Sequence, residues 1–398
     1  MDMNISNEEL ANQVRKKFID FFHEEPLLFR SPGRVNIIGE HTDYNEGFVL
    51  PVAIDKSIIT AIGKRKDGEI HLHSIDFEEL YITTLDTIKR EPSKWTNYVL
   101  GVVAQLLNAN HIISGFNLVV GGNIPIGAGL SSSAAMECSV AQALNTLFKL
   151  DLSTLKLARL AQQAEHEFAG VNCGIMDQFA SVFGKKDHAI RLDCRSMEYH
   201  FVPLDLRDYK IVLLNTSVKH SLASSEYNTR RMECEQGVKW IRQKYPYVMS
   251  LRDADREMVE ECISRLDEVV YRRCRYIVEE NNRLHLACEK LRLGNIVDLG
   301  QLMYASHKGL SEDYEVSCRE LDWLVNAVRD FPGVAGARMM GGGFGGCTIN
   351  IVKENAIRQI TEELSERYRA QTGLELEYYV AETDNGTSEI TIDKYQRA

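Results

Sequence analysis

The sequence lacks the features of membrane, secreted and nucleic-acid-binding proteins. No stretch approaches the roughly 18 uninterrupted apolar residues that suggest a membrane-spanning helix. Residues 1–13 are polar and acidic, without the basic and apolar regions of a secretory signal. The net charge of −11 argues against a nucleic acid or an anionic membrane surface as partner. The sequence therefore predicts a cytoplasmic protein that binds neither nucleic acid nor membranes.

Closely spaced cysteines and long linkers are also missing. The nine cysteines form no C-x-x-C pair and no cluster with histidine, which is typical of free thiols and of neither a disulfide framework nor a zinc site. With 398 residues the chain is too long for one ordinary core, so two domains are expected. No repeat or low-complexity linker marks the boundary. We expect it near residue 205, giving domains at 1–205 and 206–398.

Hydrophobic periodicity indicates a mixed α/β chain. Apolar stripes at helical spacing predict helices, and short alternating or β-branched runs predict strands. The expected helices are 7–22, 133–148, 153–168 and 174–183, with a long helical region over 226–310. The expected strands are 57–64, 70–74, 79–84, 116–121, 210–216 and 347–352.

Residues 123–135 (NIPIGAGLSSSAA) carry the most informative pattern. A strand ends, two glycines allow close approach of the backbone, and three serines open a small-residue helix. Exposed backbone N–H groups and a helix N-terminus can bind polyphosphate in this arrangement. No Gly-Lys-Ser/Thr follows, so this is not a Walker A loop. Taken alone, the segment could also be a tight turn with a serine cap.

Residues 33–45 (GRVNIIGEHTDYN) gather polar side chains around a glycine. Arg34, Glu40, His41 and Asp43 lie within a dozen positions. Carboxylates that accept hydrogen bonds discriminate hydroxyl stereochemistry well, because a misplaced hydroxyl leaves a buried charge unpaired. From composition alone, a charged surface turn remains the less favoured alternative.

Two further carboxylates, Glu165 and Asp177, lie twelve residues apart. Glu165 is expected on a helix ending at Phe168, and Asp177 lies in the segment 170–179 (GVNCGIMDQF). Single acidic residues on helices are usually solvated surface groups. Their assignment to a site therefore depends on the motifs around them.

Taken in order, these segments resemble the galactokinases of the GHMP kinase family, over about residues 27–350. Residues 33–51 resemble the sugar signature, 125–134 the phosphate motif, and 339–347 (MMGGGFGGC) the third glycine motif, where members often carry threonine at the position of Met340. The G-x-G-x-x-G spacing there precedes a strand. A Rossmann dinucleotide-binding site would need a helix at that point, so the spacing does not indicate one. The resemblance implies an N-terminal domain like ribosomal protein S5 domain 2, a ferredoxin-like C-terminal domain, and an active site between them.

The resemblance implies transfer of the ATP γ-phosphate to the anomeric hydroxyl of α-D-galactose, with Mg²⁺, as the first step of galactose catabolism. It implies catalytic roles for Asp177 and Arg34. The implied sugar-binding residues are Glu40, His41, Thr42, Asp43, Gly174, Asp177 and Tyr227. The implied nucleotide-binding residues are Ser74, Gly127, Ala128, Gly129, Leu130, Ser131, Ser132 and Ser133, and the implied Mg²⁺ ligands are Ser133 and Glu165. Trp95 could face the nucleotide or belong to the core.

Phosphoryl transfer needs little deprotonation of the acceptor before the transition state. We therefore expect Asp177 to orient the anomeric hydroxyl and accept its proton late, with Arg34 holding Asp177 ionised. Two alternatives stay open: another sugar-1-kinase, such as an N-acetylgalactosamine kinase, and a galactose sensor without turnover. A monomer or weak homodimer with small-molecule substrates is expected.

Overall fold

The computed structural model describes residues 5–92, 94–125, 127–218 and 223–391, and within them the chain forms three sheets. The largest has the strand order β13 (Ser388–Ile390), β1 (Leu27–Asn36), β3 (Pro51–Lys64), β6 (Phe116–Gly122), β4 (Glu69–Ser74) and β5 (Glu79–Thr84). The second has the order β10 (Val334–Met339), β11 (Cys347–Lys353), β9 (Tyr209–Asn215) and β12 (Glu377–Ala381). A small third sheet joins β2 (Phe48–Val49), β7 (His188–Asp193) and β8 (Tyr199–Pro203).

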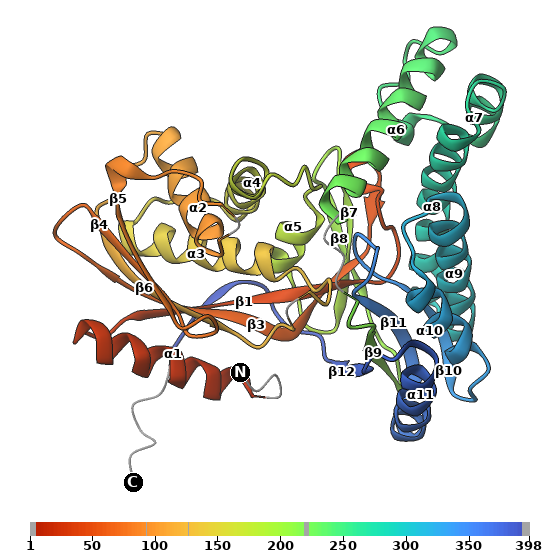
Figure 1. Cartoon of the computed structure of the whole chain (residues 1–398). Coiled ribbons are helices and arrows are strands. Elements are labelled where there is room, and N and C mark those ends of the chain that lie inside the picture. The colour runs from red at the N-terminus through yellow and green to blue at the C-terminus, as the bar shows by residue number, and fades with distance from the viewer. Residues whose placement is uncertain (1–4, 93, 126, 219–222, 392–398) are drawn as a thin grey trace.

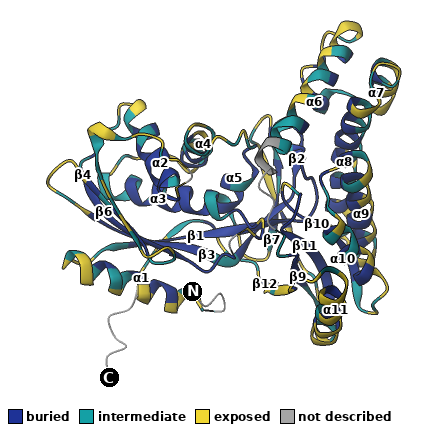
Figure 2. Ribbon diagram, viewed as in Figure 1, coloured by how far each residue is buried: buried dark blue, intermediate teal, exposed yellow. Residues whose placement is uncertain are grey.

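Helices cover both faces of the first sheet. On one face lies α1 (Asn7–Phe22), which begins with a reciprocal capping box between Ser6 and Glu9. The other face carries α2 (Thr96–Asn108), α3 (Ser132–Phe148), α4 (Thr154–Ala164) and α5 (Met176–Phe183), as Figure 1 shows. The sheet is therefore the middle of three layers, and its central strands β1, β3 and β6 are buried along nearly their whole length (Figure 2).

The second sheet packs against a helical half of the molecule. α9 (Ile296–Lys308) and α10 (Arg319–Arg329) lie on β10. α11 (Ile357–Thr372) packs on the same sheet through buried apolar side chains. The helices α6 (Ala223–Lys244), α7 (Arg256–Ile263) and α8 (Glu268–Arg292) stand beside them and project from the body (Figure 1). One buried apolar cluster runs from Phe29 in the first sheet to Ile351 in the second. The two halves therefore share a continuous core.

Most expected elements are confirmed, and the differences have physical causes. β3 begins at Pro51 instead of residue 57, because the preceding residues pair with the end of β1. β1 itself was not expected, since its polar residues hide the strand pattern. The helix expected over 153–168 is α-helical to Ala164 and then widens into a π turn, Glu165–Ala169. Single π turns of this kind often occur at functional sites.

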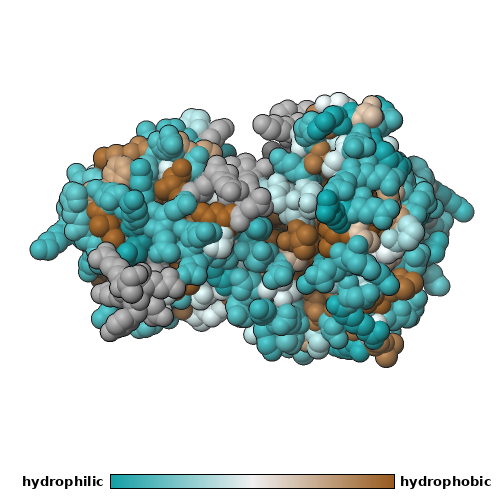
Figure 3. Space-filling model, turned by 90° about the horizontal axis from the view of Figure 1, so that it is seen from below, coloured by the Kyte–Doolittle hydropathy of each residue, from teal (hydrophilic) through white to brown (hydrophobic). Residues whose placement is uncertain are grey.

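The chain end returns to the first half of the molecule. Strand β13 pairs antiparallel with β1 over residues 28–30, and Arg30 forms an ion pair with Asp384. The predicted boundary at residue 205 stays a prediction. None of the described helices is long and apolar enough to cross a bilayer. The face seen in Figure 3 is largely hydrophilic, with apolar side chains in small separate groups.

The contact between α9 and β10 depends on two glycines. A Cβ on Gly300 would lie 1.9 Å from the carbonyl oxygen of Ala335, and a Cβ on Gly336 would lie 2.2 Å from the Cα of Gly300. Both obstacles are backbone atoms, which cannot rotate away. The close approach fixes the position of β10 against the helical half, and with it the residues that follow β10.

We expect Gly300→Ala to destabilise the fold by about 1–3 kcal/mol, the usual cost of overpacking a core. Helix propensity alone would make the alanine variant more stable by about 1 kcal/mol. A loss of stability in Gly300→Ala would therefore come from the close backbone contact. Denaturant unfolding followed by circular dichroism measures it. Gly68→Ala is the matched control, because a Cβ there meets no atom within 4 Å. A Gly300→Ala protein as stable as the parent would contradict the argument.

Candidate active site

Two adjoining cavities meet at the glycine–serine segment, residues 123–135. The first, of about 400 Å³, has a floor of charged side chains, and we call it the acidic cavity; its lining includes Arg34, Glu40, His41, Asp43, Glu165, Asp177 and Tyr227. The second, of about 520 Å³, is the apolar cavity; its lining includes Ile58, Asp76, Phe77, Trp95, Tyr98, Ile124, Met136 and Phe168. Ser133 lines both cavities, so they meet at the start of α3.

The glycine–serine loop turns into α3 through three left-handed residues. Gly127, Gly129 and Ser131 have φ values of 78°, 74° and 59°, a conformation that favours glycine. The side chains of Ala128 and Leu130 are buried in the core and anchor the loop, so only their backbone can face a ligand. The first N–H groups of a helix have no intrahelical acceptor, and here they open toward the cavities.

The third glycine loop closes over the first. The φ values of Gly341, Gly343, Gly345 and Gly346 are all positive. A Cβ on Gly341 would lie 3.4 Å from the carbonyl oxygen of Gly129, so the two loops are in contact. The side chain of Met340 is buried, and its N–H donates to the carbonyl of Cys347 at 3.0 Å. Methionine at this position therefore leaves the geometry of the loop intact.

Arg34 and Asp177 form the centre of the acidic cavity. Arg34 donates through Nε and Nη2 to the two carboxylate oxygens of Asp177, at 2.8 and 3.0 Å, and through Nη1 to the carbonyl of Gly129 at 2.7 Å. Ser131 donates to Asp177 Oδ2 at 2.6 Å. Burial alone would lower the pKa of Arg34, but the charges of Asp177 and Glu40 raise it. The guanidinium thus stays charged and links Asp177 to the glycine–serine loop through the carbonyl of Gly129.

Glu165 and Ser133 lie together beside this pair. Ser133 donates to Glu165 Oε1 at 2.9 Å, and Gln178 donates to Oε2 at 2.6 Å. Burial and the charge of Asp177 raise the pKa of Glu165. Among the described residues no group of three or more His, Cys, Asp or Glu could hold a metal ion. One carboxylate and one hydroxyl with excess negative charge around them suit Mg²⁺, which takes one or two protein oxygens when phosphates supply the rest.

Glu40 is held by a fully buried ion pair across the two halves of the molecule. Arg338, at the end of β10, donates to Glu40 Oε1 at 2.9 Å, and the N–H of Gly341 donates to the same oxygen at 2.8 Å. Arg338 also donates to the carbonyls of Ile37 and Met339. The Glu40 carboxylate therefore fixes residues 33–45 to β10 and to the third glycine loop, residues 339–347.

Asp43 lies against Gly174, although the two residues are 131 positions apart. A Cβ on residue 174 would lie 1.9 Å from Asp43 Oδ2, so the carboxylate occupies the space that glycine leaves. Burial, with the neighbouring charge of Asp177, raises the pKa of Asp43 to about 7. Burial, reinforced by the charge of Arg230, lowers the pKa of His41 to about 3, so its imidazole is neutral at physiological pH. The ring centroids of Tyr227 and His41 lie 5.2 Å apart.

Six predicted site residues line neither cavity: Thr42, Ser74, Gly127, Ala128, Leu130 and Ser131. The hydroxyl of Thr42 lies 2.9 Å from the carbonyl oxygen of Gly39 and 2.5 Å from that of Phe48, so it holds the loop together. Ser74, at the end of β4, is buried, and its Oγ accepts from the N–H of Phe77. Trp95 lines the apolar cavity and donates to Glu79 at 3.0 Å. Residues 219–222, which precede Tyr227 in the sequence, lie outside the described residues.

Sequence reasoning missed several residues that shape the site. The Oδ1 atom of Asp76 is buried in the apolar cavity without a partner among the described residues, and burial raises its pKa to about 6. Gln178 and Tyr44 hold side chains that were predicted. Asp76 follows Ser74 by two positions at a strand end, which is the one local signal that could have found it. Arg338 carries no such signal, because its partner is 298 positions away.

Three family models match the chain. They are described as "GHMP kinases N terminal domain" over residues 97–185, "Galactokinase galactose-binding signature" over 16–64, and "GHMP kinases C terminal" over 287–370. A galactokinase of Thermotoga maritima is 42% identical over 364 residues, which is 92% of this chain and 100% of the relative. A galactokinase of Fusobacterium nucleatum is 43% identical over 96% of this chain and 100% of its own.

Solved structures agree with these relatives. The structure of Lactococcus lactis galactokinase complexed with galactose superposes with a TM-score of 0.92 at 38% identity, covering 95% of this chain and 99% of the other. Methanococcus jannaschii mevalonate kinase superposes with a TM-score of 0.67 at 19% identity, covering 91% and 99%. The second likeness concerns the fold alone.

We expect Arg338→Met to destabilise the protein by about 3–5 kcal/mol, because it leaves the Glu40 carboxylate buried without its counter-ion. Thermal and denaturant unfolding measure the loss. The double variant Arg338→Met/Glu40→Gln should recover part of it, since the glutamine carries no buried charge. If the single and double variants are equally unstable, the pairing with Glu40 is not the source of the effect.

Proposed function

The chain belongs to the galactokinases of the GHMP kinase family, which are ATP-dependent, and we propose that its two cavities hold the substrates of that reaction in line. The γ-phosphate of ATP passes to the anomeric hydroxyl of α-D-galactose, giving galactose 1-phosphate and ADP. The observation that carries the proposal is the junction at Ser133, where the acidic cavity meets the start of α3 beside Arg34 and Asp177. The acceptor and the transferring phosphate would meet there.

Asp177 orients the acceptor hydroxyl and takes its proton late. The carboxylate is fixed on both oxygens by Arg34 and on one by Ser131, so it cannot turn away from the substrate. Because the transition state of phosphoryl transfer is largely dissociative, positioning and charge stabilisation contribute more than early proton removal. Arg34 holds the Asp177 carboxylate through two hydrogen bonds and stabilises negative charge on the phosphoryl oxygens. Asp177 and Arg34 are thus the proposed catalytic residues.

The nucleotide base would lie in the apolar cavity, with its phosphates on the loop from Gly127 to Ser133. Phe77 and Trp95 stand nearly parallel there, with ring centroids 6.5 Å apart. The N–H groups at the start of α3 and the helix dipole favour the phosphate charge. Ser74 supports this site indirectly, through its contact with the backbone of Phe77.

Ser133 and Glu165 would hold Mg²⁺ beside these phosphates. Their oxygens lie 2.9 Å apart, and the raised pKa of Glu165 indicates a carboxylate that a cation would stabilise. The ion would neutralise charge on the phosphate oxygens. Gln178 keeps the carboxylate of Glu165 in place by donating to its second oxygen.

Galactose would fill the acidic cavity. Glu40, Asp43 and Asp177 line it with their carboxylates, and Tyr227 is also part of its lining. A hydroxyl of the wrong stereochemistry would leave one of these buried charges unpaired, which is a strong basis for discrimination. The proposal includes a cytoplasmic location and a monomer or weak homodimer, in keeping with the acidic composition and the free thiols.

The proposal predicts ADP release with Mg·ATP and galactose, with phosphorus NMR identifying an anomeric phosphate. Glucose, N-acetylgalactosamine, mevalonate and homoserine are the comparison acceptors. Chelating the Mg²⁺ with EDTA should end turnover. Galactose binding without ADP release would indicate a sensor, and turnover on N-acetylgalactosamine alone would indicate a different sugar-1-kinase.

Asp177→Asn should lower kcat by about 10²–10⁴-fold, the usual contribution of a positioned acid–base group. Galactose binding, measured by calorimetry, should largely survive, because asparagine keeps the shape and one acceptor oxygen. Glu167→Gln on the neighbouring π turn lies outside both cavities and serves as a control. Unchanged turnover in the Asp177→Asn protein would remove the assignment.

A further inference from the structure

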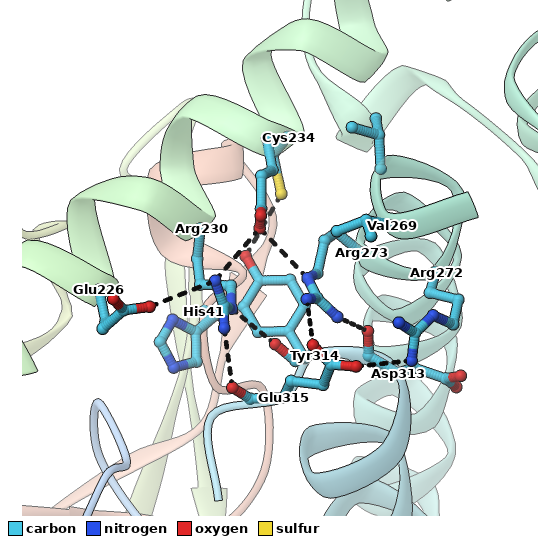
Figure 4. Close-up of polar contacts among 12 residues, drawn as sticks. His41, Glu226, Arg230, Cys234, Val269, Arg272, Arg273, Asp313, Tyr314 and Glu315 are labelled. Atoms are coloured by element: carbon cyan, nitrogen blue, oxygen red, sulfur yellow. Dashed lines mark hydrogen bonds and ion pairs between the residues drawn. The ribbon is translucent and has the colours of Figure 1, made fainter. Parts of the chain in front are cut away.

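A chain of hydrogen bonds runs from the helical half of the molecule to His41. The Nδ1 atom of His41 lies 2.8 Å from the hydroxyl of Tyr44, which lies 2.7 Å from the hydroxyl of Tyr314. That hydroxyl lies 3.3 Å from Cys234 Sγ, on α6. Figure 4 shows Tyr314 between Cys234 and His41. Four side chains from three distant parts of the sequence thus form one connected series.

Three of the four members are shielded from solvent, and Tyr44 is half-buried. The side chains of His41, Cys234 and Tyr314 are almost completely buried. The imidazole is neutral because of its lowered pKa and therefore carries a single N–H. The proton can sit on Nδ1 or on Nε2, and the hydrogen bond made by one nitrogen decides which of them carries it.

The chemistry of the partners favours one direction for the series. A phenol is a better hydrogen-bond donor than a neutral imidazole N–H, and an imidazole nitrogen is a better acceptor than a phenol oxygen. The Tyr44 hydroxyl therefore donates to Nδ1 of His41. Since each hydroxyl has one proton, Tyr314 donates to Tyr44, and the thiol of Cys234 donates to Tyr314. The imidazole proton is left on Nε2.

Two arginines hold the backbone on either side of Tyr314. Arg230, three residues after Tyr227 on α6, donates to the carbonyls of Tyr314 and Glu315 at 2.7 and 2.9 Å (Figure 4). Arg273 on α8 donates to the carbonyl of Asp313 and to the carboxylate of Glu315. Both arginines are buried, so the backbone that carries Tyr314 is held from two helices.

We propose that Tyr44 and Tyr314 are positioning residues that hold His41 in the tautomer protonated at Nε2, so that His41 donates a hydrogen bond to a hydroxyl oxygen of the sugar. This inference rests on the proposed function, because it concerns the ligand of the acidic cavity. The other polar groups proposed to touch the sugar include the carboxylates of Glu40 and Asp177, and Asp43, whose pKa of about 7 leaves it partly protonated at neutral pH. The Nε2 atom is buried and makes no hydrogen bond to a described residue by distance and angle, while the backbone of Gly342, which also lines the acidic cavity, acts on His41 as a hydrogen-bonding group and opposes the lowering of its pKa. A sugar hydroxyl would compete with that backbone group for the Nε2 proton.

The first test reads the tautomer directly, by ¹⁵N NMR of the histidine side chains in the free enzyme. The signals of His41 are identified by their loss in His41→Gln. We expect Nε2 to carry the proton in the parent protein, and a mixture of tautomers in Tyr44→Phe and in Tyr314→Phe. Tyr304→Phe is the matched control, since that buried hydroxyl has no partner among the described residues. A proton on Nδ1 in the parent, or an unchanged spectrum in Tyr44→Phe, would overturn the proposal.

The second test measures kcat and KM for galactose and for each monodeoxy galactose that keeps the anomeric hydroxyl. Tyr44→Phe should raise the KM for galactose by about tenfold with little change in kcat. For one deoxy sugar, the one without the oxygen that His41 contacts, the variant and the parent should differ much less. An equal loss for every sugar would mean that Tyr44 only supports the fold. If the parent does not phosphorylate galactose, the proposed function fails, while the tautomer measurement still stands on its own.

Discussion

The buried pair of Arg338 and Glu40 is the interaction on which the arrangement of the site depends. It joins β10 of the second sheet to the loop after β1 of the first, and neither side chain is open to solvent. A buried ion pair seldom adds net stability, because removing two charges from water costs about as much as their attraction returns. The pair instead fixes the position of β10 relative to the loop that follows β1. Glu40 can face a ligand only when the two halves and the third glycine loop are correctly docked.

The charges of the site explain why nucleotide and metal ion should arrive together. Asp177, Glu165 and Asp43 share a small volume, and Arg34 is the cation bonded to Asp177. Burial and mutual repulsion raise the pKa of both Glu165 and Asp43. Adding a polyphosphate to this environment without a cation would increase the repulsion. A Mg²⁺ ion held by Glu165 and Ser133, as proposed, would remove that obstacle, and two protein oxygens would be enough because the phosphates supply further ligands.

The sequence predicted what lies within a motif and missed what joins motifs. Arg34, Asp177, Glu165 and Ser133 were each expected, and the structure brings them together at the junction of the two cavities. Thr42 and Ser74 show the limit of that reasoning, since nearby backbone groups already engage both hydroxyls. A motif names polar residues, but only the folded backbone decides which of them a ligand can reach.

The residues that were missed have partners far away in the sequence. Tyr44 and Tyr314 are 270 positions apart, and neither stands out as a site residue, because a tyrosine in a polar loop is usually explained by packing. The pairing of Gly174 with Asp43 is similar: each position is understood only when the other is present, since any side chain at 174 would displace the carboxylate. Such pairs arise from tertiary packing, which a single sequence does not contain. The specificity of this site therefore lies largely in contacts between motifs, which explains why a family resemblance could name the reaction before it could explain how the sugar is held.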